Sequence, residues 1–167
     1  MIHAVTVTNA HGESLRLDLR NPYQTGLAIE SITGLGPVNA DVAMTDYATL
    51  DGGLFSNSRL TTRNIVIQLR FIWYSETIEM IRHKTYKYFP VKQPIILDFE
   101  TDERNVLASG YVESNEPNIF SANEGCQISI LCPDSYFYSG EGSGTTIVEF
   151  SKSENVFEIP FDNNSLT

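Results

Sequence analysis

Alternation of apolar and polar residues is the dominant pattern of this chain, and it predicts β-strands. Residues 4–8 are rich in β-branched side chains, residues 14–20 place three leucines on one face, and a polar turn with Gly12 joins the two segments. This arrangement predicts a β-hairpin. The other predicted strands cover residues 27–35, 64–73, 94–100, 106–112 and 125–132, with a second hairpin formed by 94–100 and 106–112 and a break at Pro117-Asn118.

The segment 64–73 has the clearest two-faced pattern. Its odd-numbered positions from Ile65 to Trp73 are all large and apolar, whereas its even-numbered positions mix apolar and polar residues. Successive side chains of a strand point to opposite faces, so we expect the first face to lie in the core and the second to be partly covered. The predicted core consists of Ile65, Ile67, Leu69, Phe71, Ile81, Ile96, Leu97, Ile128 and Ile130.

One segment has helical rather than strand periodicity. Ser75 is the predicted N-cap, Glu76 and Glu79 occupy the first turn where the helix dipole favours negative charge, and Pro90 ends the helix. Apolar residues recur at three- to four-residue spacing and cover one side only, so the helix should lie on a sheet. The predicted fold class is therefore mainly β with one α-helix (α+β), a β-sandwich-like domain.

Residues 36–62 are mostly small, polar and acidic, with sparse apolar positions and a sharp turn at Asp51-Gly52-Gly53. A segment of this length without regular structure is uncommon in a compact domain unless it has a function. Two interpretations stay open: a long surface hairpin packed on its own domain, or an arm (belt) that packs on a neighbouring subunit. The residues predicted to form the subunit interface through this belt are Val38, Val42, Met44, Tyr47, Leu50, Leu54, Phe55, Arg59 and Arg63.

The last part of the chain changes in character. Residues 133–138 are predicted to leave the domain, and the Gly- and Ser-rich residues that follow form a flexible linker. Residues 145–151 and 156–159 predict another hairpin, which is marginal in water on its own. We therefore expect a ring-forming domain over residues 1–139, then a linker and short hairpin over 140–167 that pairs with the main domain or is the remnant or start of a further domain.

The two cysteines, Cys126 and Cys132, lie on the same face of one predicted strand. Six residues of strand separate them by about 20 Å, far beyond the reach of a disulfide. They are predicted to be small buried thiols, and no further Cys or His lies nearby to complete a zinc site.

The charge of the chain argues against binding to nucleic acid. The formal net charge is −10, and residues 105–167 carry one basic and nine acidic residues, whereas residues 59–92 carry an excess of basic residues. An acidic chain is a poor candidate for phosphate-driven DNA binding. The uneven distribution favours either self-complementary assembly or two solvated faces. No 18-residue apolar window predicts a membrane span, and the N-terminus lacks the features of a signal peptide.

No motif in the sequence carries catalysis. The three histidines His3, His11 and His83 are dispersed, and no metalloprotease, nucleophile-elbow or P-loop motif occurs. Gly34-Leu35-Gly36 lacks the third glycine of a dinucleotide-binding loop. We therefore predict a protein that is not an enzyme and needs no cofactor or metal.

Several segments together resemble the N-terminal domain of siphophage distal tail proteins. They are residues 32–37, 49–59 and 62–67, the helix ending at Pro90, the two closing hairpins, and the exit segment Cys132-Pro133-Asp134-Ser135-Tyr136-Phe137-Tyr138. The resemblance extends over residues 1–140 and rests on the order of these pieces and on the turn-rich Gly-Leu-Gly, Asp-Gly and Arg-Asn-Ile block.

The resemblance implies a structural role in a phage tail tip. Members of this family have a β-sandwich with one helix, and six copies close into a ring in which a belt, matching residues 36–62 here, wraps the neighbouring subunit. The ring joins the tail tube to the hub or tail-associated protein and surrounds the DNA conduit, which implies a location in the virion tail after synthesis in the host cytoplasm. The family's second domain, which often holds receptor-binding proteins, has no full counterpart in residues 145–167.

Two other functions stay open. The chain is also compatible with another tail-tube or tail-completion ring protein of related architecture. A carbohydrate-binding β-sandwich is the second alternative, because aromatic residues cluster at Trp73-Tyr74 and at Tyr136-Phe137-Tyr138.

Overall fold

An eight-stranded antiparallel sheet and one α-helix form the body of the molecule in the computed structural model, which describes residues 1–46, 51–74, 76–118, 120 and 123–140. The strands are β1 Ile2–Thr8, β2 Ser14–Asp18, β3 Leu27–Thr33, β4 Ala40–Asp46, β5 Gly53–Leu60, β6 Arg63–Phe71, β7 Pro94–Thr101, β8 Asn105–Asn118, β9 Gly125–Cys132 and β10 Tyr138–Gly140. The helices are the 3-10 turn η1 Pro22–Gln24 and α1 Ile78–Tyr88.

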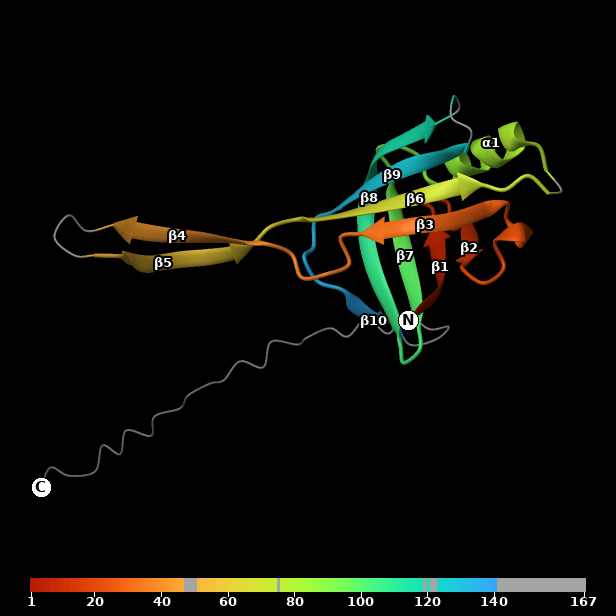
Figure 1. The fold of residues 1–167 in the computed structure, drawn as a ribbon. Coiled ribbons are helices and arrows are strands. Elements are labelled where there is room, and N and C mark those ends of the chain that lie inside the picture. The colour runs from red at the N-terminus through yellow and green to blue at the C-terminus, as the bar shows by residue number, and fades with distance from the viewer. Residues whose placement is uncertain (47–50, 75, 119, 121–122, 141–167) are drawn as a thin grey trace, which may run out of the picture.

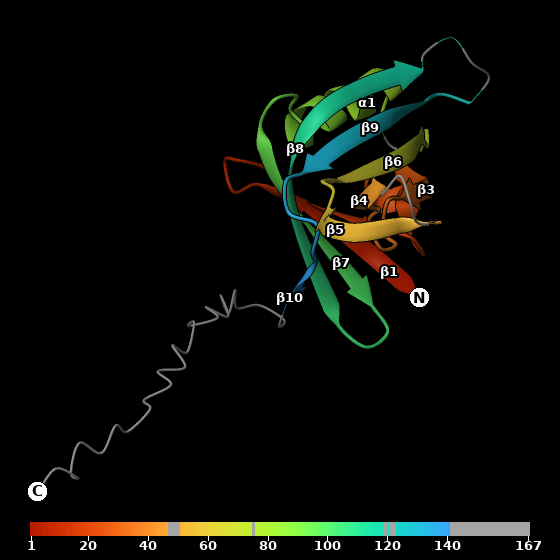
Figure 2. The same cartoon turned by 90° about the vertical axis from the view of Figure 1, so that its left-hand side faces the viewer.

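The sheet is strongly curved. Its strand order is β2-β1-β7-β8-β9-β6-β3, with β10 added to β8, and the end strands β2 and β3 approach each other. In Figure 1, β3 and β6 run across the view while β7 and β8 run from top to bottom, and Figure 2 shows the same curvature from the side. The two halves of one sheet thus enclose a common core, which gives the mainly β fold with one helix that the sequence predicted.

One face of each strand supplies the core, in agreement with the alternation in the sequence. Ile65, Ile67, Leu69 and Phe71 of β6 are all buried. The other predicted core residues are also buried, except Ile96, which is 49% exposed, whereas its neighbours Ile95 and Leu97 are buried. The prediction for Ile96 was wrong because adjacent residues of a strand cannot face the same side.

Trp73 also lies outside the core, because β6 ends at Phe71 and the chain then leaves the sheet. The Trp73 side chain is 75% exposed. The alternating apolar pattern therefore continues two residues beyond the strand itself.

Helix α1 begins two residues later than predicted. Thr77 is the N-cap, its side-chain oxygen accepting a hydrogen bond from the Met80 backbone N–H at 3.3 Å, while the predicted cap Ser75 lies outside the described residues. Glu76 precedes the helix and pairs with Lys84 at 2.6 Å instead of occupying the first turn. The buried residues Ile81 and Thr85 confirm the one-sided apolar stripe.

The segment after β7 is more regular than predicted. Strand β8 continues through Pro117 to Asn118, with Pro117 opposite Cys126, so the predicted break does not interrupt pairing. The predicted linker begins as a strand, because Tyr138–Gly140 pairs with β8. The hairpin predicted over 145–159 lies outside the described residues, which end at 140.

Cys126 and Cys132 are buried free thiols on the same face of β9, as predicted. Burial raises the pKa of the Cys126 thiol to about 12. This thiol therefore stays protonated and unreactive at neutral pH.

Candidate functional site

Strands β4 and β5 form a two-stranded antiparallel ribbon that projects from the body (Figure 1). We call residues 37–62 the arm. All described side chains of β4 and β5 are exposed. The predicted turn is present, with Gly52 at a φ of +94°, a conformation that favours glycine. Of the two interpretations of this stretch, the structure therefore has a hairpin, but one that extends away from its own domain.

The pairing register gives the arm two different faces. Met44 lies opposite Phe55, and Val42 lies two residues before Met44 on the same strand, so these three side chains share a face. Leu60 lies opposite Ala40, two residues before Val42, and extends the same face to the base of the arm. Met44 is 62% exposed and Phe55 is 58% exposed. The arm therefore presents an apolar face, formed by Val42, Met44, Phe55 and Leu60, that no described part of the chain covers.

The opposite face of the arm is mixed and carries an ion pair. Asp41 and Arg59 are paired in the register, and the Arg59 guanidinium lies 3.2 Å from the Asp41 carboxylate. Leu54 lies opposite Thr45 on this same face. Arg59 therefore has an acidic partner on its own arm, and such an exposed pair contributes at most about 1 kcal/mol.

The remaining residues predicted for the belt interface are dispersed. Val38 is half-buried at the base of the arm, Tyr47 and Leu50 lie outside the described residues, and Arg63 is buried in the body. Arg63 does not project from the belt, so the structure gives it a place different from the one predicted.

The arm ends at a network around the guanidinium of Arg63, a residue that is 4% exposed. Nη1 donates to the backbone oxygens of Gly34 and Gly36, and Nη2 donates to that of Ser135 at 2.8 Å. The Phe137 ring lies 4.1 Å from the guanidinium carbon, close enough for a cation–π contact. This network joins Gly34 and Gly36, where the chain enters the arm, to Ser135 and Phe137 of the exit segment.

Sequence reasoning missed Gly34, Ser135 and Phe137 as members of this network. Gly34 has a φ of +84°, and a Cβ there would lie 1.9 Å from the backbone oxygen of Asn64. The Gly-Leu-Gly sequence was a usable signal for such a close approach. The contribution of Ser135 is mainly a backbone oxygen, which no residue pattern reveals.

Most cations of residues 59–92 form ion pairs with carboxylates of the same chain. The pairs are Arg59–Asp41, Arg70–Glu30, Arg82–Glu79, Lys84–Glu76 and Lys87–Glu13. Three of these carboxylates, Asp41, Glu30 and Glu13, lie outside the stretch, whereas Glu76 and Glu79 belong to it, so the excess of basic residues is partly neutralised by the rest of the fold.

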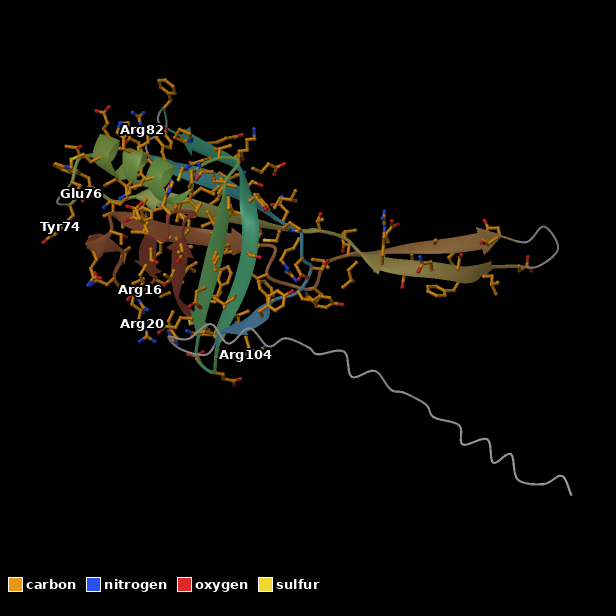
Figure 3. The ribbon with its side chains drawn as sticks, turned by 180° about the vertical axis from the view of Figure 1, so that it is seen from behind. Arg16, Arg20, Tyr74, Glu76, Arg82 and Arg104 are labelled. Carbon is orange, nitrogen blue, oxygen red and sulfur yellow. The ribbon has the colours of Figure 1, made fainter. Side chains whose placement is uncertain are left out.

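An aromatic cluster lies at the end of the body opposite the arm, where Figure 3 labels Tyr74. Tyr23 and Tyr74 meet edge to face with ring centroids 5.8 Å apart, and both are exposed, as is Trp73. Of the second predicted cluster, Phe137 contacts Phe99 and Arg63, and the Tyr138 hydroxyl hydrogen-bonds to Asp134. The first cluster therefore offers one pair of exposed aromatic rings in contact, Tyr23 and Tyr74.

The described residues contain no group of three or more His, Cys, Asp or Glu side chains that could hold a metal ion. Helix α1 is too short to cross a membrane, and the described part of the chain has no other helix that is long and apolar enough to do so.

Comparison with solved structures shows that this fold is similar to the folds of phage hub and baseplate chains. The chain is similar to the Dit protein of phage SPP1, described as a paradigm of the hub adsorption apparatus in phages that infect Gram-positive bacteria, with 14% identity and a TM-score of 0.57 over 81% of this chain and 52% of that one. It is also similar to a chain of the phage p2 baseplate in its activated conformation with strontium, with 15% identity and a TM-score of 0.58 over 76% of this chain and 43% of that one.

The calcium form of the activated p2 baseplate gives 15% identity and a TM-score of 0.57 over 78% of this chain and 44% of the solved chain. This chain therefore spans about half the length of the solved chains it matches. No protein-family model matches the sequence, and no curated protein sequence does.

Proposed function

We propose that this chain is a structural, non-enzymatic component of a phage tail tip, in which six copies close into a ring through the arm. The ring connects the tail tube to the hub or tail-associated protein and forms part of the DNA conduit of the virion tail. The fold shared with phage hub and baseplate chains supports the tail-tip role.

The observation that carries the proposal is the uncovered apolar face of the arm. A two-stranded ribbon is marginal in water by itself, and this one exposes Val42, Met44, Phe55 and Leu60 along one side. A contact between this face and a different surface of the next copy is heterologous, and heterologous contacts form a ring when the rotation between neighbours closes and an open filament when it does not. Burial on the neighbour would stabilise both the arm and the assembly.

The test compares two charges placed on opposite faces of the same strand. Met44→Asp puts a carboxylate on the apolar face, and Thr45→Asp puts the same carboxylate on the mixed face as the matched control. Native mass spectrometry and analytical ultracentrifugation should find particles of six 18.7 kDa chains for the wild type and for Thr45→Asp, and a folded monomer for Met44→Asp. A wild-type chain that stays monomeric at every concentration would refute the ring.

Electron microscopy separates the tail-tip ring from the related possibility of a tail-tube protein. Single or paired rings support the proposed role, whereas long tubes of stacked rings would support a tube protein. Incubation of the rings with purified tail tube and with hub protein then tests each proposed partner, and receptor-binding proteins of the same phage are the third class to test.

We expect the protein to be passive toward DNA, as suits a conduit. The net charge of −10 and the internal pairing of most basic residues of the central stretch both oppose phosphate binding. Double-stranded DNA should therefore show no shift in a gel even at low salt. A tight complex with a steep salt dependence would overturn this part of the proposal.

Carbohydrate binding is a second candidate, favoured by the exposed contact between Tyr23 and Tyr74 beside Trp73. Aromatic faces supply the apolar contact on which sugars stack, although the cluster is small. Trp73 is the single tryptophan of the chain, so its fluorescence reports directly on the site. A glycan array followed by fluorescence titration of wild type and Trp73→Ala tests this function.

A further inference from the structure

We propose that Arg63 is a positioning residue that sets the direction of the arm and couples it to the exit segment, residues 133–138. The importance of this coupling for assembly rests on the proposed function, because the arm is the assembly element there. The coupling itself rests on contacts within one chain and can be tested in a chain that does not assemble.

The guanidinium of Arg63 joins two stretches that are far apart in sequence. Nη1 donates to the backbone oxygens of Gly34 and Gly36, which lead into the arm, with the second bond at 2.7 Å. Nε and Nη2 donate to the backbone oxygen of Ser135 at 3.3 and 2.8 Å. Four N–H groups in one rigid plane are thus used, a geometry that the point-like ammonium of lysine cannot reproduce.

A second contact joins the chain that returns from the arm, after β5, to Ser135. The Ser135 hydroxyl donates to the backbone oxygen of Thr61 at 2.6 Å, just after β5 ends. Ser135 therefore contacts the outgoing strand through its side chain and the incoming strand through Arg63. The chain entering the arm and the chain leaving it are therefore both connected to Ser135 of the exit segment.

The exit segment is itself attached to the body by an aromatic contact. The ring of Phe137 lies against the Arg63 guanidinium and meets Phe99 of β7 edge to face, with centroids 6.1 Å apart. A buried cation is costly unless it is fully hydrogen-bonded, so loss of any of these contacts weakens the whole network. In Figure 1, the base of the arm and β10, which begins at the end of the exit segment and pairs with β8, lie on the same side of the body.

The consequence is a mechanical link from the exit segment to the assembly arm. A partner that displaces the exit segment would release Ser135 from Arg63 and Thr61 at once. Within the described part of the arm, β4 and β5 pair with each other and their side chains are exposed, so the direction of the arm would then be free to change.

The experiment measures the direction of the arm by distances between two spin labels. Spin labels at Asn57→Cys on the mixed face of β5 and at Ser109→Cys on β8 report the distance between the arm and the body. Both positions are exposed, whereas the native cysteines are buried, so labelling is confined to the introduced cysteines. All variants also carry Met44→Asp, so that the result does not depend on ring formation.

Arg63→Lys, Ser135→Ala and Phe137→Leu should each broaden and shift the distance distribution, which we expect to roughly double in width for Arg63→Lys. Tyr136→Ser is the matched control in the same segment, because the Tyr136 side chain is 65% exposed, and this variant should leave the distribution of distances unchanged. Guanidinium ions far below denaturing concentrations should narrow the distribution again in Arg63→Ala, which a general loss of stability would not allow.

Two results would overturn the coupling. One is a wild-type distribution as broad as that of Arg63→Lys, and the other is an unchanged distribution in both Ser135→Ala and Phe137→Leu. Failure of the ring proposal instead appears as a monomeric wild type in ultracentrifugation, so the two failures are distinguishable.

Discussion

Two adjacent isoleucines of β7 provide a sharp test of the fold, because the structure assigns them to opposite faces of the sheet. Ile95 is 2% exposed and belongs to the core, whereas Ile96 is 49% exposed on the outer face. Ile95→Ala and Ile96→Ala remove the same atoms from the same strand. Any difference in their stability therefore reports the register of β7 rather than the chemistry of the substitution.

The expected magnitudes follow from burial. Ile95→Ala removes three buried carbon groups worth about 0.8 kcal/mol each, and the cavity that remains raises the expected loss to about 3–4 kcal/mol. At Ile96, half of the side chain is already in water, and the loss of strand propensity adds little, so the expected cost is about 1 kcal/mol or less. The predicted gap between the two variants is therefore about 2–3 kcal/mol.

Urea unfolding followed by circular dichroism measures this gap, at a protein concentration low enough for the chain to be monomeric. With an m-value of about 1–3 kcal/mol/M, Ile95→Ala should lower the midpoint by at least about 1 M and Ile96→Ala by a few tenths. Equal losses, or a smaller loss for Ile95→Ala, would mean that β7 is shifted by one residue and that the assigned core face is wrong.

Three further predictions concern single sites. Gly34→Ala should destabilise the fold by well over 1 kcal/mol in thermal unfolding, because its φ is +84° and its Cβ would overlap a backbone oxygen, whereas Gly12→Ala, at +79° in open space, should cost only about 1 kcal/mol. Burial, and secondarily Glu100, raise the pKa of Asp98, so the folded chain holds a proton that the unfolded chain has released, and stability falls as the pH rises from 3.8 through the raised pKa. Asp98→Asn should therefore be more stable than wild type at pH 7, with the difference vanishing in acid; a variant less stable at pH 7 would contradict this. Iodoacetamide at pH 8 should leave the Cys126 thiol unmodified in the folded chain and modify it after unfolding, as mass spectrometry of peptides would show.

The strands and the helix were largely predictable because their signals are local. Period-two alternation located β6 and β9, and the one-sided stripe around Ile81 located α1. The errors lie at element ends, as at Trp73, where an apolar residue continues the pattern beyond the last backbone pairing. The outward position of Ile96 was also available from alternation, since Leu97 could not share its face.

The candidate site was less predictable, because its properties depend on pairing across strands. The sequence marked residues 36–62 as unusual and named Met44 and Phe55, but only the register places these two side chains opposite each other on one face. Composition also gave no way to separate Arg59, which lies exposed on the arm, from Arg63, which lies buried at its base.

The sequence by itself determined most strands of the body, the α-helix, the positions of most core residues and the absence of a recognisable catalytic motif, because each of these depends on residues close together in the chain. Only the tertiary structure decided which face of the arm is apolar, which carboxylates neutralise the central cations, and that Arg63 meets Ser135, 72 positions away. These features depend on sheet register and on backbone oxygens. Every residue has such an oxygen, so no residue pattern distinguishes the ones that Arg63 binds.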